Sequence, residues 1–178
     1  MHRKSLKLRN LTTVKWHANC LVMICIGLFI ISMMLEHVWG LVPCVLCQLQ
    51  RLVMLLVCFF SIAQRAFIGR LRCFSFFSCL GFIFLIAGFA ICLRHIWLQN
   101  QPLDVSLQCL PSLGVLWQWW PWHAILEKIL QGDALCQQVA WRLLGLSLPQ
   151  WLSAVYLGLS IYWVMLLRQV YHLNVRGA

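Results

Sequence analysis

The sequence predicts an all-α, polytopic membrane protein: a four-transmembrane-helix bundle with one long loop on its outer side. Two observations carry this prediction. Apolar residues make up 62% of the 178 residues and charged residues only 10%, which is too few to cover a water-soluble particle. Four apolar stretches are also long enough to cross a hydrocarbon core of about 30 Å as helices. A soluble enzyme and a disordered chain are both excluded.

The four predicted spans are Ala18–Leu35, Pro43–Ala63, Cys73–Leu93 and Leu148–Leu167. None shows the alternation of a β-barrel strand, and in lipid an apolar run satisfies its backbone hydrogen bonds only as a helix. The first span follows a basic segment, as a signal peptide does, but no small-residue cleavage site comes after it. We therefore expect an uncleaved anchor and a single membrane domain over residues 1–178.

The placement of charge predicts that both termini lie in the cytoplasm. Ten of the 14 Lys and Arg residues precede the first span, follow the last, or lie between the second and third, and such residues stay on the cytoplasmic side. All four acidic residues fall in the two opposite loops, 36–42 and 94–147. Topology and anionic lipid account for the net charge of +10, so we expect no nucleic acid partner.

The long outer loop contains a tryptophan-rich segment, residues 113–130, which ends in a helical stretch over 124–130. Because tryptophan prefers the headgroup level of a membrane, we expect this segment to lie along the outer membrane surface. An ordinary loop packed on the helices is the alternative. In both cases the loop stays close to the membrane.

The ten cysteines divide by compartment. Six lie inside the spans, where an unperturbed thiol is a small hydrophobic group: Cys20, Cys25, Cys58, Cys73, Cys79 and Cys92. The remaining four lie at or beyond the outer face: Cys44, Cys47, Cys109 and Cys136. An even number of thiols in an oxidising space indicates disulfides, and two pairs are the natural count.

The C-x-x-C motif of Cys44 and Cys47 is typical of a redox-active pair. A disulfide across this spacing closes so small a loop that it stabilises a fold little. Pro43 places the pair at the N-terminus of the second span, where unpaired amides and the positive end of the helix dipole favour thiolate. Half of a zinc site is the alternative, but a closed site needs four ligands, and the outer histidines form no second pair of suitable spacing.

Arg51 shares a helical face with Cys44 and Cys47, about one turn inside the membrane. An intramembrane charge indicates a functional site. The alternative is that the Arg51 side chain extends to the outer headgroups. His95 is expected at a similar depth, with Gln99 four residues further on the same face. A redox pair beside a buried cation suggests a lipid-soluble acceptor, because arginine would stabilise the negative charge that a quinone gains on reduction.

With these residues the sequence resembles the bacterial disulfide bond formation protein DsbB family. The resemblance covers most of the chain, from Pro43-Cys44-Val45-Leu46-Cys47 and Gln50-Arg51, through His95, Gln99, Cys109 and Cys136, to the run from Trp141 to Trp151. It implies a bacterial inner-membrane enzyme that reoxidises a periplasmic DsbA-like thiol oxidase and passes the electrons to ubiquinone or menaquinone. The active cysteines would face the periplasm.

The resemblance also implies a role for each site residue. Cys109 and Cys136 look like the loop pair that accepts electrons, with Cys109 attacked to form the mixed disulfide with the partner. Cys44 and Cys47 look like the pair that reoxidises the loop and reduces the quinone, with the Cys44 thiolate meeting the acceptor. The quinone pocket would be lined by Arg51, His95 and Gln99.

Two departures and two alternatives accompany the resemblance. Gln50 stands where some family members have Glu, which puts a role for a carboxylate there in doubt, and Cys92 leaves an off-pathway disulfide open. One alternative is a paralogue dedicated to a substrate other than a general oxidase. The other is a non-catalytic membrane module that binds metal through outer Cys and His residues, or whose disulfides are structural.

Overall fold

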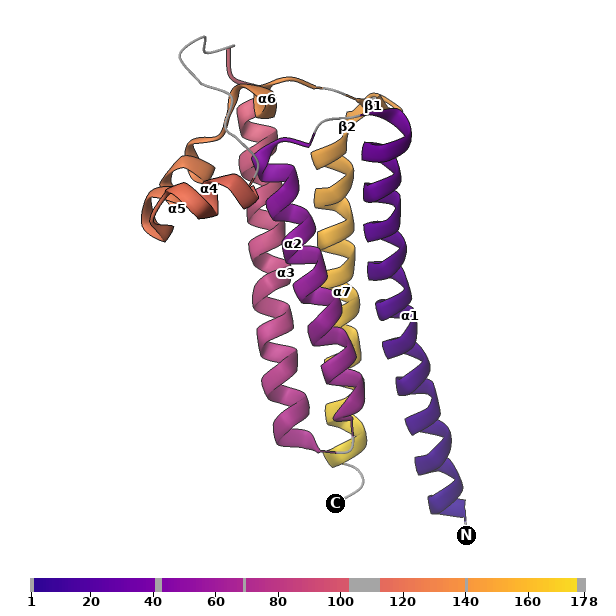
Figure 1. Ribbon diagram of the computed structural model, residues 1–178. Coiled ribbons are helices and arrows are strands. Elements are labelled where there is room, and N and C mark those ends of the chain that lie inside the picture. The colour runs from indigo at the N-terminus through magenta and orange to yellow at the C-terminus, as the bar shows by residue number, and fades with distance from the viewer. Residues whose placement is uncertain (1, 41–42, 69, 103–112, 140, 176–178) are drawn as a thin grey trace.

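The computed structural model describes residues 2–40, 43–68, 70–102, 113–139 and 141–175. Four long helices form a bundle in it and confirm the predicted fold class: α1 (His2–Trp39), α2 (Val45–Ala66), α3 (Leu71–Gln99) and α7 (Leu148–Val175) (Figure 1). Each contains a stretch long and apolar enough to cross a membrane: Val14–Trp39, Val45–Ala66, Arg72–Gln99 and Leu148–His172. The beginning of α1 and the end of α7 lie at the same end of the bundle.

The helices extend beyond the spans that hydropathy predicts. The third span is expected to end at Leu93, whereas α3 continues through His95 to Gln99. Hydropathy marks only the part of a helix that lipid surrounds, and backbone hydrogen bonding continues until a residue such as Pro102 interrupts it. His95 therefore projects from a rigid helix.

Large rings from α7 pack against glycines of α3 in the core of the bundle. Trp163 lies over Gly81 and Tyr156 over Gly88, and a Cβ atom at either glycine would collide with the ring. Small residues allow this close approach of membrane helices. The Tyr156 hydroxyl also donates to the backbone oxygen of Gln50 at 3.0 Å. These contacts hold α2, α3 and α7 in a fixed register.

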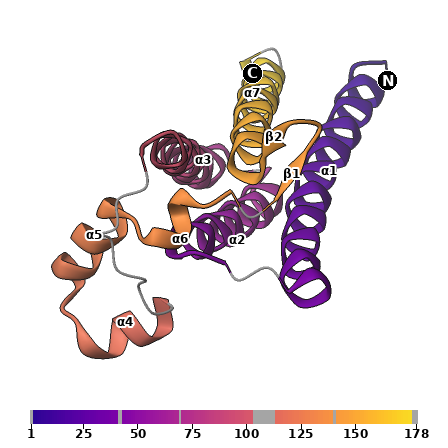
Figure 2. The same cartoon turned by 90° about the horizontal axis from the view of Figure 1, so that it is seen from above.

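Three short helices lie near the outer end of the bundle: α4 (Leu113–Trp119), α5 (Trp122–Gln131) and α6 (Ala134–Gln137). Seen from above, α4 and α5 project sideways from α2 and α3 (Figure 2). Leu116, Ile125 and Ile129 pack into an apolar cluster with residues of the bundle, whereas Trp119 and Trp122 are 77% and 71% exposed. The expected helix over 124–130 is confirmed as part of α5. The packing of α4 and α5 on the bundle leaves Trp119 and Trp122 exposed. That these tryptophans lie at the membrane surface stays a prediction.

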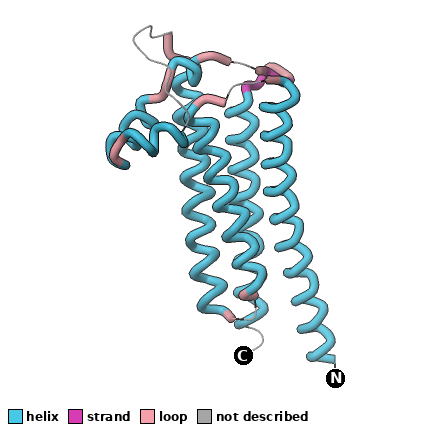
Figure 3. The backbone as a smooth tube through the Cα atoms, in the orientation of Figure 1, coloured by secondary structure: helices cyan, strands magenta, loops and turns pink. Residues whose placement is uncertain are grey.

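A small hairpin, which the sequence analysis did not predict, connects α6 to α7. Its strands β1 (Arg142–Leu143) and β2 (Leu146–Ser147) are antiparallel and lie above α7, beside the outer end of α1 (Figure 3). Leu144 and Gly145 form the turn with positive φ angles of 53° and 81°, as a two-residue hairpin turn requires. The Trp151 indole donates to the Leu143 oxygen at 3.0 Å and so attaches the hairpin to the first turn of α7.

Candidate functional site

The C-x-x-C motif lies where α2 begins, as its sequence predicts. Cys44 is the N-cap residue, and its sulfur accepts a hydrogen bond from the backbone N–H of Cys47 at 3.4 Å. The Sγ atoms of Cys44 and Cys47 are 3.1 Å apart. Cys44 is buried and Cys47 is half-buried. The two sulfurs therefore differ in access, although only two residues separate them.

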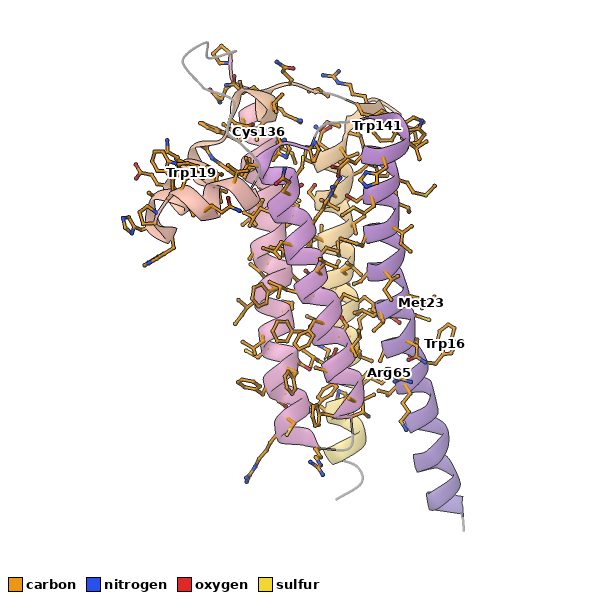
Figure 4. The ribbon with its side chains drawn as sticks, in the orientation of Figure 1. Trp16, Met23, Arg65, Trp119, Cys136 and Trp141 are labelled. Carbon is orange, nitrogen blue, oxygen red and sulfur yellow. The ribbon has the colours of Figure 1, made fainter. Side chains whose placement is uncertain are left out.

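Cys136 is the loop cysteine that the fold brings to this motif. It lies in α6, whose N-cap residue Asp133 accepts a hydrogen bond through Oδ1 from the Cys136 N–H at 2.8 Å. Its side chain is fully buried in the same apolar cluster as Cys44, and its sulfur lies within 4.8 Å of the Cys44 sulfur. Figure 4 shows Cys136 at the outer end of the bundle. One cysteine of the predicted loop pair thus contacts one cysteine of the C-x-x-C motif.

His95 of α3 lies against the same two sulfurs. Its Nε2 is 3.8 Å from Cys44 Sγ, and the imidazole is buried. The sulfurs of Cys44 and Cys136 and a ring nitrogen of His95 all lie within 4.8 Å of one another. We call these three residues the thiol–imidazole cluster. The sequence predicted that His95 lies near Arg51 and Gln99. Its position beside Cys44 and Cys136 results from the packing of α3 against α2 and α6.

Hydrogen bonding and burial together make both cluster thiols weaker acids than the sequence suggests. The hydrogen bond to Cys44 raises the pKa of Cys136, and burial and the Asp133 carboxylate raise it further. The hydrogen bond from Cys136 lowers the pKa of Cys44, but hydrogen bonding to Cys47 and burial outweigh this, so the pKa lies above its ordinary value. The backbone N–H of Cys47 lowers the pKa of Cys44, as expected at a helix N-terminus, but the contributions that raise this pKa are larger when all these thiols are reduced.

Arg51 is held by side-chain and backbone groups of α1. Its Nε donates to Ser32 Oγ at 2.6 Å, its Nη2 donates to the Ser32 backbone oxygen at 2.9 Å, and its Nη1 forms an ion pair with Glu36. The Arg51 side chain is 16% exposed. The guanidinium is therefore fixed between α1 and α2 with its charge partly balanced.

A cavity of about 660 Å³ connects the C-x-x-C cysteines with the three residues predicted to bind the acceptor. Its lining includes Cys44, Cys47, Gln50, Arg51, His95 and Gln99. Most of the other lining side chains are apolar. Ligand sites for small organic molecules commonly have this size and this mixture of apolar walls with a few polar groups. Two further lining residues, Trp39 and Trp141, stack with their ring centres 6.3 Å apart, which connects α1 to the segment before the hairpin. Figure 4 shows Trp141 beside the outer end of α1.

The chain matches the family model of disulfide bond formation protein DsbB over residues 15–166. It belongs to the DsbB family. The disulfide bond formation protein B of Stutzerimonas stutzeri is 37% identical over 147 residues, covering 79% of this chain and 88% of the relative. That of Marinobacter nauticus is 36% identical over 156 residues, covering 84% and 88%. Disulfide bond formation protein B 1 of Pseudomonas aeruginosa is 37% identical over 140 residues, covering 77% and 86%.

DsbB membership and the four apolar helices make the chain a multi-pass membrane protein of a disulfide bond formation family. Among the residues assigned to its site, Cys109 lies outside the described residues, so its role stays a prediction. Gln50 donates to the sulfur of Cys92 at 3.4 Å, which places this additional thiol in the core of the bundle. Gln99 accepts a hydrogen bond from Ser147 at 2.8 Å.

Sequence reasoning missed three residues of this DsbB-family site. Glu36 and Ser32 hold Arg51, and Asp133 positions Cys136. A signal was present for two of them, because only four acidic residues occur in the chain and Asp133 stands three residues before Cys136, as a helix N-cap would. Nothing in the spacing marked Ser32.

Proposed function

We propose that this protein is a thiol:quinone oxidoreductase, which reoxidises a periplasmic DsbA-like thiol oxidase and passes the electrons to membrane ubiquinone or menaquinone. We place it in the bacterial inner membrane, with both termini in the cytoplasm. One observation carries the proposal: the loop cysteine Cys136 contacts Cys44, while Cys47 lines an apolar cavity together with Arg51. This arrangement puts a route for thiol–disulfide exchange next to a site for a lipid-soluble acceptor.

The contact between Cys136 and Cys44 suggests an order of exchange. The partner's thiolate attacks Cys109 of an oxidised Cys109–Cys136 pair, and Cys136 leaves as the thiolate. Cys136 then attacks Cys44 of an oxidised Cys44–Cys47 pair, which forms a Cys44–Cys136 disulfide and releases Cys47 with the electron pair. The resemblance assigned the thiolate that faces the acceptor to Cys44. Because Cys44 is the neighbour of Cys136, we assign the thiolate that faces the acceptor to Cys47 instead.

The cavity fits a quinone in size and chemistry. A quinone, when bound, supplies an acceptor for two electrons and two protons. Three of the five N–H groups of Arg51 are used by Ser32 and Glu36. Its fixed guanidinium therefore offers positive charge and further donors at one place in the wall, which favours the reduced acceptor. His95 and Gln99 add polar groups at the outer end of the same cavity.

Quinone reduction by the purified protein in detergent tests the proposal. The full chain is supplied with a reduced periplasmic C-x-x-C oxidase, and quinone absorbance is followed. We expect turnover that disappears in Cys44→Ser and persists in the matched variant Cys79→Ser, because Cys79 lies on the exposed side of α3. Absence of turnover with both ubiquinone and menaquinone, using folded protein and a competent donor, would contradict the proposal.

A further inference from the structure

The thiol–imidazole cluster has the donor set and the spacing of a metal site. Cys44 Sγ is 3.8 Å from His95 Nε2, and the Cys136 sulfur lies within 4.8 Å of both residues' donor atoms. In tetrahedral zinc sites, bonds of about 2.0–2.3 Å put neighbouring ligand atoms roughly 3.5–3.8 Å apart. Small side-chain movements are enough to bring these three donors around one ion. Thiol–disulfide exchange requires the two sulfurs but no imidazole beside them.

A buried carboxylate next to the cluster is a second and independent observation. His95 Nδ1 and Asp133 Oδ2 are both buried, and neither has a hydrogen-bond partner among the described residues. Asp133 has no exposed surface, and its carboxylate interacts electrostatically with the imidazole. Histidine ligands in metal sites nearly always donate their second ring N–H to a carboxylate, a backbone carbonyl or water. Asp133 interacts electrostatically with this imidazole, and a movement that brings Oδ2 within hydrogen-bond distance of Nδ1 would satisfy both buried atoms.

We propose that the reduced protein binds Zn²⁺ through Cys44 Sγ, Cys136 Sγ and His95 Nε2, with Asp133 orienting the imidazole. Each coordinating thiol loses its proton on binding, and the fourth position stays open to water. A Cys44–Cys47 or Cys44–Cys136 disulfide removes ligands, so only the reduced form binds. Bound metal in turn blocks exchange at both sulfurs, which makes the site a reversible brake on disulfide formation.

Cobalt(II) serves as the spectroscopic probe of this site. The full chain is reduced in detergent, freed of metal with a chelator and titrated anaerobically, without quinone or partner. We expect one equivalent of Co²⁺ to give near-ultraviolet sulfur-to-cobalt charge-transfer absorption and the strong visible bands of tetrahedral cobalt, and Zn²⁺ to bleach both. Because neither substrate is present, the result is independent of whether the protein reduces quinones.

Matched variants separate this site from the other thiols of the chain. His95→Ala and Cys136→Ala should lose the tetrahedral spectrum, and Cys79→Ala should keep it. Asp133→Asn should keep the spectrum but lower cobalt affinity by about 10- to 100-fold, because the amide still caps α6 but holds the imidazole less well. Circular dichroism and size exclusion verify that each variant is folded.

Two results would overturn the proposal. One is a reduced wild-type protein with no charge-transfer absorption or with only weak octahedral bands. The other is a spectrum that is the same in His95→Ala as in Cys79→Ala. Zinc protection provides a second measurement: one equivalent of Zn²⁺ should slow alkylation of Cys136 at least about tenfold in wild type and leave it unchanged in His95→Ala.

Discussion

The guanidinium of Arg51 on α2 forms an ion pair with Glu36 near the outer end of α1. This contact, with those to Ser32, joins two helices along one wall of the cavity that contains the C-x-x-C cysteines. A charge inside a membrane is expensive unless it is paired, so the partner on α1 explains how arginine is tolerated at this depth. It also fixes the guanidinium relative to Cys47.

Arg51→Ala should weaken the use of quinone while exchange between the cysteine pairs continues. Hydrogen bonds to charged groups contribute about 1.5–3 kcal/mol, which corresponds to a loss in kcat/KM for quinone of roughly 10- to 100-fold. Steady-state kinetics at varied quinone concentration measure this effect, and thiol trapping of the partner measures exchange separately. Unchanged quinone kinetics would reject Arg51 as part of the acceptor site.

Glu36→Gln should have a smaller effect of the same kind. The amide can still accept a hydrogen bond from Arg51 but no longer balances its charge, so we expect a change in KM for quinone of a few fold, on the order of 1 kcal/mol or less. The same kinetic assay measures it. Glu127→Gln on the exposed side of α5 is the matched acid-to-amide control and should behave as wild type. Equal effects of the two changes would contradict a positioning role for Glu36.

Disulfide mapping tests whether Cys44 or Cys47 is the cysteine that Cys136 attacks. In the double variant Cys47→Ser/Cys109→Ser, mild oxidation should join Cys44 to Cys136, because their sulfurs lie within 4.8 Å of each other. In the matched variant Cys44→Ser/Cys109→Ser, Cys47 is the remaining cysteine of the motif. The disulfide between Cys47 and Cys136 should form more slowly. Peptide mass spectrometry follows both reactions. Faster bonding in the second variant would reverse our assignment of the attacked sulfur.

Alkylation of Cys136 in the reduced protein should shift to high pH. The hydrogen bond to Cys44 raises the pKa of Cys136, so less thiolate is present at any given pH and the rate rises only above the usual range for a thiol. In Cys44→Ala the largest cause of the shift is gone, and the midpoint of the rate profile should move to lower pH. A midpoint that stays unchanged or rises in this variant would argue against the contact.

Gly88→Ala should destabilise the bundle. A Cβ atom at Gly88 collides with the Tyr156 ring, and overpacking of this kind costs about 1–3 kcal/mol. Thermal unfolding in detergent, followed by circular dichroism, should show a lower midpoint. Gly158→Ala is the matched control in α7, because a Cβ there meets no atom within 4 Å. If the two variants unfold at the same temperature, Tyr156 is not packed against α3 as described.

Cobalt binding to the thiol–imidazole cluster tests the role of His95, a residue that none of the substitutions in the preceding predictions changes. Loss of quinone turnover in Cys44→Ser together with cobalt binding in wild type would support both proposals. Each of the two can fail without the other.

The sequence by itself determined the fold class and the family, because both depend on features that are local in the chain. Apolar runs of membrane-spanning length can only be helices in lipid, and α1, α2, α3 and α7 form where those runs lie. Pro43 and the Cys44 cap likewise place the C-x-x-C motif at the beginning of α2 without help from the rest of the molecule.

Only the tertiary structure decided which side chains meet. The contact of Cys136 with Cys44 and the position of His95 against both sulfurs depend on the packing of α6 and α3 at the outer end of α2. Helix periodicity gives the face of each helix but not the rotation and height of one helix against another. Those are set by long-range contacts such as Tyr156 over Gly88. The same packing buries Cys44, and hydrogen bonding to Cys47 and burial raise the pKa of its thiol.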